Sequence, residues 1–152
     1  MSEPRDERSA GPETGHDALG EVAGMGVAYV DTTAMVALVD RDDRSHAAMA
    51  EAYRSLVAER YRLFTTDFAV AETFDLLRTG VGATIARQWL RDNTLDVYHV
   101  DQADVRRARR VVLRHQAGTA MSFADAICLV VMERFDVGDA LAADPDFLAG
   151  AG

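Results

Sequence analysis

Residues 27–39 read VAYVDTTAMVALV, a short apolar run that ends at an aspartate. Residues 27–30 have the length of a strand and contain no polar residue, which is typical of a strand buried on both faces of a parallel sheet. Asp31 and the two threonines after it favour the start of a helix, and residues 34–38 continue it with apolar side chains. We therefore expect the Asp31 carboxylate at the carboxyl end of a central strand, where open α/β sheets place ligand sites.

The rest of the chain repeats this alternation of strands and helices. The pattern predicts strands over residues 62–66, 95–100 and 137–143, and helices over residues 46–60, 68–78, 83–91, 101–115 and 122–135. Residues 25–152 are expected to form one α/β domain with a parallel sheet. Residues 1–24 are rich in Glu, Asp, Gly and Pro, carry a net charge of −4 and have no apolar period, so they are expected to form a disordered acidic tail.

The composition limits how the protein contacts other molecules. The formal charge is −9, and all 16 basic residues are arginine, so any phosphate-binding surface is expected to be local. One candidate is the row Arg106, Arg110 and Arg114, spaced i, i+4 and i+8; the alternative is a solvated helix side. Cys128 is the only cysteine, so no internal disulfide forms. No apolar run is long enough to span a membrane, and a soluble cytoplasmic protein is expected.

Four acidic residues are candidate metal ligands: Asp31, Glu72, Asp125 and Asp144. Each has a local explanation, because Asp31, Asp125 and Asp144 also fit helix-capping positions and Glu72 fits an exposed helix. Asp31 and Asp144 each end an apolar strand, however, so both should reach the same crevice at the edge of the sheet. Carboxylates about 4 Å apart repel by roughly 4 kcal/mol. A cluster of four therefore predicts a hard cation, Mg²⁺ or Mn²⁺.

Two hydroxyl residues accompany these acids. Thr33 and Ser122 either hold ligand waters and orient carboxylates, or only cap helices. Other chemistries find no support in the sequence, since the histidines and Cys128 lack zinc spacing, and no glycine-rich phosphate loop or nucleophile elbow is present.

Four segments together resemble PIN-domain ribonucleases, in particular VapC-type toxins of bacterial type II toxin–antitoxin pairs: VDTTA, LFTTDFAVAETFDLLR, SFADAI and ALAADPDF. The resemblance implies a three-layer α/β/α sandwich with a parallel sheet of four to five strands. It also implies an Mg²⁺- or Mn²⁺-dependent endoribonuclease that is inhibited by a VapB-like antitoxin. By position, the four acids match the catalytic and metal-binding residues of the family, and Thr33 and Ser122 match its supporting hydroxyls.

Two other functions remain open at this stage. A non-catalytic PIN-fold module would dock a basic partner in the acidic groove, and a structure-selective DNase would use the same acids, because these do not distinguish ribose from deoxyribose. Apolar faces on the early helices also lead us to expect a homodimer.

Overall fold

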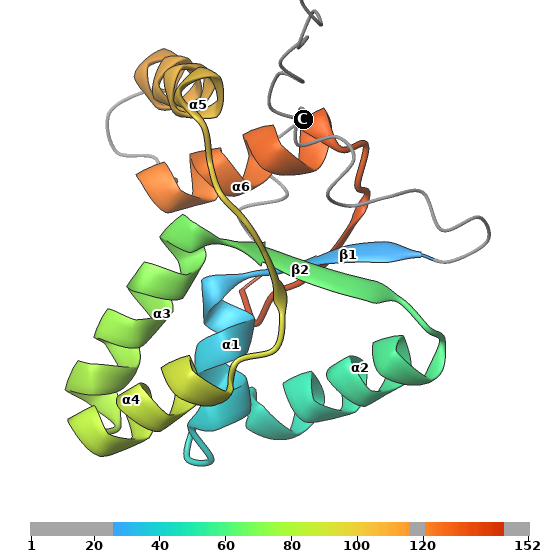
Figure 1. Ribbon diagram of the computed structural model, residues 1–152, viewed down its shortest axis with the longest axis vertical. Helices are drawn as coiled ribbons and strands as arrows, with labels where there is room; N and C mark the ends of the chain where they lie inside the picture. The colour runs from blue at the N-terminus through green and yellow to red at the C-terminus, as the bar shows by residue number, and fades with distance from the viewer. Residues whose placement is uncertain (1–25, 116–120, 145–152) are drawn as a thin grey trace, which may run out of the picture.

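The computed structural model describes residues 26–115 and 121–144. Within these ranges, strands and helices follow the predicted order (Figure 1). The predicted tail over residues 1–24 and any fifth strand after Asp144 lie outside the described residues. The strands are β1 (Val27–Val30), β2 (Arg62–Thr66), β3 (Asp96–Tyr98) and β4 (Asp139–Leu141). The helices are α1 (Thr32–Val39), α2 (His46–Ala58), α3 (Asp67–Gly80), α4 (Ala83–Asp92), α5 (Gln102–Arg114) and α6 (Phe123–Arg134).

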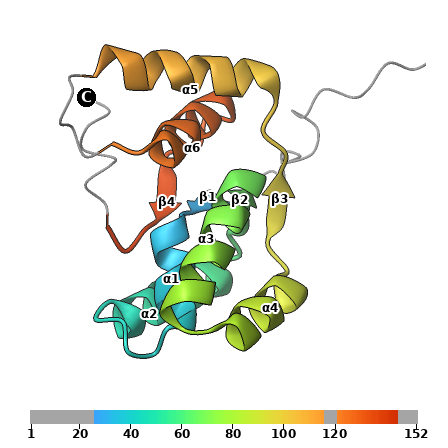
Figure 2. The same cartoon turned by 90° about the vertical axis from the view of Figure 1, so that its left-hand side faces the viewer.

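The strands form one sheet in the order β3-β2-β1-β4, and every pairing is parallel. Helices α5 and α6 cover one face of the sheet, whereas α1 to α4 cover the other (Figure 1). This arrangement confirms the predicted three-layer α/β/α sandwich. Because all strands run the same way, their carboxyl ends meet at one edge, and Figure 2 looks onto that edge, where α1, α3 and α6 begin.

The outer strands are shorter than the sequence predicts. Residues 95–100 and 137–143 are the predicted strands, but β3 covers only Asp96–Tyr98 and β4 only Asp139–Leu141. Each of them pairs with a single neighbour, so the ladder of hydrogen bonds is confined to the few residues that face β2 or β1. None of the helices within the described ranges is long and apolar enough to cross a membrane.

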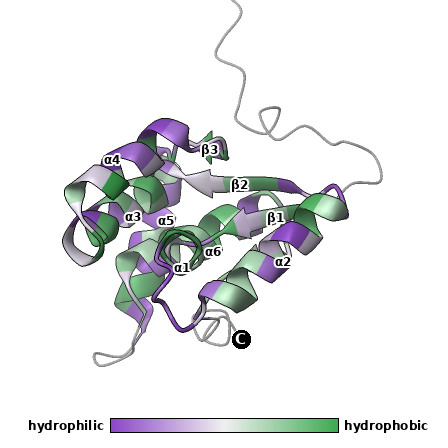
Figure 3. Ribbon diagram, turned by 90° about the horizontal axis from the view of Figure 1, so that it is seen from below, coloured by the Kyte–Doolittle hydropathy of each residue, from purple (hydrophilic) through white to green (hydrophobic). Residues whose placement is uncertain are grey.

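The core lies on both faces of β1, as its continuous apolar run predicts. Tyr29 points into a cluster with Phe64 and the buried residues of α6, and the neighbouring Val30 points into a second cluster with α1 and α3. Both side chains are at most 1% exposed. Helix α1 is correspondingly hydrophobic along its length, while α2 and α4 carry hydrophilic residues on their outer sides (Figure 3). Because β1 and α1 are packed into these clusters, they hold Asp31, the residue between them, in a fixed position.

Candidate active site

Asp31 lies at the junction of β1 and α1 and is only 5% exposed. Its backbone is extended, and its Oδ2 accepts hydrogen bonds from the Thr33 backbone N–H at 3.2 Å and from the Thr33 hydroxyl at 2.8 Å. Its own N–H donates to the Leu141 carbonyl at 2.9 Å, which ties it to β4. The capping role expected from the sequence is therefore present, and one carboxylate oxygen is committed to it.

Glu72 and Asp125 approach Asp31 from two other helices. Glu72 lies in the second turn of α3 and is exposed, and Asp125 lies in the first turn of α6 and is half-buried. Ser122 and Asp125 form a reciprocal capping box, since Ser122 Oγ accepts from the Asp125 N–H and Asp125 Oδ2 accepts from the Ser122 N–H, both at 3.0 Å. This box sets the first turn of α6 and orients the Asp125 carboxylate.

The three carboxylates share one electrostatic environment. Burial raises the pKa of Asp31; hydrogen bonds from Thr33 oppose the rise, and the negative charge of Asp125 adds to it. Burial also raises the pKa of Glu72, where a hydrogen bond with Thr32 opposes the rise and the charges of Asp31 and Asp125 add to it. Both shifts disfavour the ionised form, mainly because burial removes water from the carboxylates and in smaller part because like charges lie nearby.

The backbone of Asp144 is connected to Asp31 through the side chain of Thr33. The Thr33 hydroxyl accepts hydrogen bonds from the N–H of Ala143 at 3.0 Å and of Asp144 at 3.4 Å. The Asp144 side chain is exposed and lines a cavity of about 300 Å³ together with Thr33 and Leu76. Thr33 thus connects the Asp31 carboxylate to the segment that carries Asp144, although the two residues are more than 100 positions apart.

The metal site stays a prediction at this stage. Among residues 26–115 and 121–144, no three or more His, Cys, Asp or Glu side chains are arranged closely enough to form a metal-binding group. The donors nevertheless suit a hard cation, because Asp31, Glu72 and Asp125 offer only oxygen, and the charge of Asp125 contributes to the raised pKa of both Asp31 and Glu72.

Arg44 lines the cavity beside Asp144, whereas the arginine row predicted from the sequence lies on another helix. Arg106, Arg110 and Arg114 are exposed on α5, which packs on α6 in the other helical layer. The charges that shift the pKa of Glu72 are carboxylates alone. The sequence interpretation of a phosphate-binding row on α5 therefore remains a prediction.

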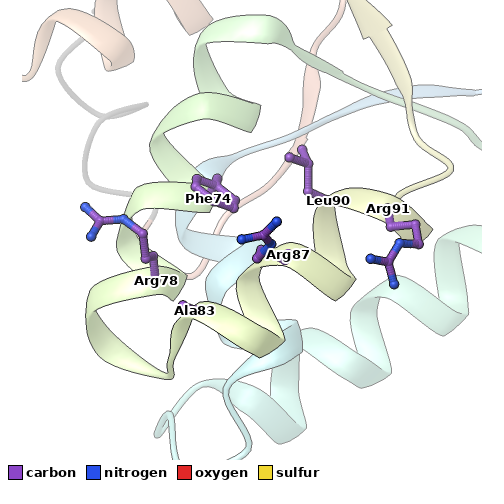
Figure 4. A pocket seen from close by; sticks show the side chains of 6 residues that line it. All are labelled: Phe74, Arg78, Ala83, Arg87, Leu90 and Arg91. Carbon is purple, nitrogen blue, oxygen red and sulfur yellow. The ribbon is translucent and has the colours of Figure 1, made fainter.

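Sequence reasoning missed a second arginine cluster between α3 and α4. A cavity of about 440 Å³, here called the arginine pocket, is lined by Phe74, Arg78, Ala83, Arg87, Leu90 and Arg91. Arg87 lies between Phe74 and Leu90, with Arg78 and Arg91 at the two outer ends (Figure 4). The i, i+4 spacing of Arg87 and Arg91 could have indicated that both lie on one side of a helix. The sequence does not show that α3 supplies Phe74 and Arg78 to the same pocket, because this depends on the turn at residues 80–82 that folds α4 back onto α3.

The fold is a parallel α/β/α sandwich, and Asp31, Glu72 and Asp125 lie toward the carboxyl edge of its sheet. The family model for the PIN domain matches residues 28–151, and the chain therefore belongs to the PIN-domain family. This confirms the family resemblance found in the sequence.

A solved relative is the crystal structure of VapC20 from Mycobacterium tuberculosis, described as a sarcin-ricin loop cleaving toxin. It matches with a TM-score of 0.70 and 27% sequence identity, over 82% of this chain and 95% of that chain. Comparison with curated proteins gives no match.

Replacing Thr33 with Val tests the link between Asp31 and Asp144. The substitution keeps the shape but removes the hydroxyl that binds Asp31 Oδ2 and accepts two backbone N–H groups. We expect activity to fall about 10- to 100-fold, as for other groups that orient a ligand carboxylate, and stability to fall by about 1–2 kcal/mol. The rate of RNA cleavage measures the loss of activity, and urea unfolding measures the loss of stability.

The matched control for this substitution is Thr79→Val. The Thr79 hydroxyl is exposed, and its partners among the described residues are carbonyls of its own helix, at 3.1 and 3.2 Å. If Thr33→Val were no worse than Thr79→Val in either measurement, the Thr33 hydroxyl would not organise the site.

Proposed function

We propose that this protein is the toxin of a type II toxin–antitoxin pair and acts as an endoribonuclease that hydrolyses RNA phosphodiester bonds. The observation that carries this proposal is the electrostatic coupling of Asp31, Glu72 and Asp125, which come from the end of β1, from α3 and from α6. Membership of the PIN-domain family and the likeness to VapC20 support it.

Asp31, Glu72 and Asp125, with Asp144 beside them, would hold Mg²⁺ or Mn²⁺. A bound cation of this kind supplies an activated water and neutralises charge on the phosphate under attack. Thr33 holds the Asp31 carboxylate in one orientation, and the Ser122 capping box does the same for Asp125. One of the carboxylates accepts the proton of the attacking water.

The remaining parts of the proposal concern domain organisation and partners. Residues 25–152 form the nuclease domain, preceded by the acidic tail over residues 1–24. A VapB-like antitoxin inhibits the enzyme in the cytoplasm, and the protein forms a homodimer. The exposed face of Arg106, Arg110 and Arg114 on α5 provides local positive charge for RNA on an otherwise acidic protein.

The test is cleavage of a structured RNA pool that includes a sarcin–ricin loop, with Mg²⁺, Mn²⁺ or EDTA and a DNA pool of matched sequence. We expect antitoxin-free protein to cut RNA with a metal, to be inactive in EDTA and to leave the DNA intact. Cutting of DNA in preference to RNA would indicate the DNase alternative, and well-folded protein that cuts neither pool would contradict an enzymatic function.

A further inference from the structure

The arginine pocket lies on a different flank of α3 from Glu72. Phe74 lies two positions after Glu72, a step that turns the helix by about 200°, and Arg78 lies six positions after Glu72, a step that advances the helix by about 9 Å. The pocket is therefore separate from the acidic site, yet one helix connects the two and fixes the distance between them.

The positive charge in the pocket is poorly neutralised. Arg87 and Arg91 are exposed, and no carboxylate of the described residues lies within ion-pair distance of either. Arg78 meets Asp75 only at 3.8 Å, with both side chains more than half exposed, which contributes little. Three arginines gathered in a chain of net charge −9 favour an anionic ligand over a neutral one.

The lining of the pocket also has an apolar part. Phe74 of α3 and Leu90 of α4 flank Arg87, and Leu90 is 48% exposed (Figure 4). Guanidinium groups bind phosphate with two parallel hydrogen bonds, and aromatic or guanidinium planes stack with bases. A ligand that combines an anionic group with a flat apolar body, such as a nucleotide, fits both parts.

We propose that the arginine pocket is a second RNA-binding site, which holds a nucleotide remote from the phosphate that is cut. This inference rests on the proposed RNA substrate. An RNA with its scissile phosphate at the acids must cross α3 to reach the pocket. The pocket therefore contributes to the binding of long or folded RNA and not to the chemical step.

The first test compares Arg87→Ala and Arg91→Ala with Arg54→Ala. Arg54 is an exposed arginine on α2, so all three variants lose one positive charge from a helix that tolerates alanine. RNA binding is measured by fluorescence anisotropy in EDTA, and cleavage is measured with metal for a long RNA and for a trinucleotide. Circular dichroism establishes that each variant is folded.

We expect each pocket variant to bind the long RNA about tenfold more weakly, with KM raised and kcat unchanged. Cleavage of the trinucleotide should be unaffected. The dependence of log Kd on log salt should become shallower by about 0.7 for a lost phosphate contact. Arg54→Ala should change none of these quantities beyond a small general charge effect.

The outcomes separate this inference from the proposed function. If the wild-type protein cleaves RNA but the pocket variants bind RNA as tightly as Arg54→Ala does, the second RNA site is wrong and the enzymatic function still holds. A wild type without cleavage overturns the enzymatic function, and the anisotropy measurement still decides the pocket. If the wild-type protein binds a polyglutamate peptide but not RNA, and Arg87→Ala abolishes that binding, the pocket would belong to an acidic protein partner. This result would overturn the proposal.

Discussion

Asp31→Asn is expected to reduce RNA cleavage by about a thousandfold or more. Removing one carboxylate weakens the binding of the cation that would stabilise the reacting phosphate, a contribution of several kcal/mol to the barrier. Asn can still accept the hydrogen bond from the Thr33 N–H and remains a good helix cap. Single-turnover cleavage with Mg²⁺ and with Mn²⁺ measures the effect, and calorimetric titration measures the loss of metal affinity.

The same substitution should leave the metal-free protein as stable as the wild type, or slightly more stable. Asp31 is 5% exposed, and its partners within the described residues are neutral donors, so its ionised form is costly to bury. Thermal unfolding in EDTA tests this expectation. The control is Glu51→Gln, an exposed acid on α2 that should change neither activity nor stability.

Two results would contradict the role assigned to Asp31. One is full activity in the Asn variant, which would remove Asp31 from the reaction. The other is a large loss of stability in EDTA, which would show that the carboxylate serves mainly to cap α1. Glu72→Gln should lose activity in the same way as Asp31→Asn, because the two acids share the site.

Arg134→Met is expected to destabilise the fold by about 3–5 kcal/mol, the cost of leaving a buried charge unpaired. Arg134 Nη1 donates to Asp104 Oδ1 at 2.9 Å, to Asp101 Oδ2 at 2.7 Å and to the Tyr98 hydroxyl at 2.8 Å. Asp104 is 1% exposed and accepts a further hydrogen bond from Tyr98 at 2.6 Å. The loss would be a large part of the 5–15 kcal/mol that stabilises a typical domain.

Urea unfolding measures this loss, and Arg107→Met is the matched control. Arg107 also joins α5 to α6, through Glu133 at 3.0 Å, but its partner is 74% exposed. A pair of this kind contributes at most about 1 kcal/mol. Equal losses in the two variants would mean that burial of Asp104 does not decide the strength of the network.

The network also makes a pH-dependent contribution to stability. Hydrogen bonds from Arg134 and from the Asp104 N–H hold the pKa of Asp101 below its ordinary value. A carboxyl group whose pKa is lower in the folded state stabilises the protein above its unfolded pKa, and this stabilisation disappears as the pH falls through the folded pKa. This contribution to wild-type stability should therefore disappear below about pH 4, and the loss should be smaller in Arg134→Met.

Much of the local structure around the acids was predictable from the sequence. The run before Asp31 predicted a strand buried on both faces, and Tyr29 and Val30 enter separate cores. The three-residue spacing of Ser122 and Asp125 predicted their capping box. These features depend on neighbours within a few positions, so propensity and spacing report them directly.

The assembly of the site was only partly predictable. Parallel strands implied that residues following β1 and β4 would lie close together, and Thr33 does contact the segment of Asp144. The sequence suggested a cluster of four carboxylates, and the structure brings the charges of Asp31 and Asp125 to bear on Glu72. Which side chains approach closely depends on the packing angles of α3 and α6, which no local pattern specifies.

By itself the sequence determined the order of strands and helices, because this order follows from short-range periodicity and capping. It also identified the candidate acids, and its resemblance to PIN domains implied the three-layer class. Tertiary structure alone decided that Arg134 neutralises Asp104 and that Arg87 faces Phe74 across a pocket. Both arrangements join residues from different helices. Their energies come from burial and from charges brought together by packing, and these quantities have no counterpart in the linear order of the residues.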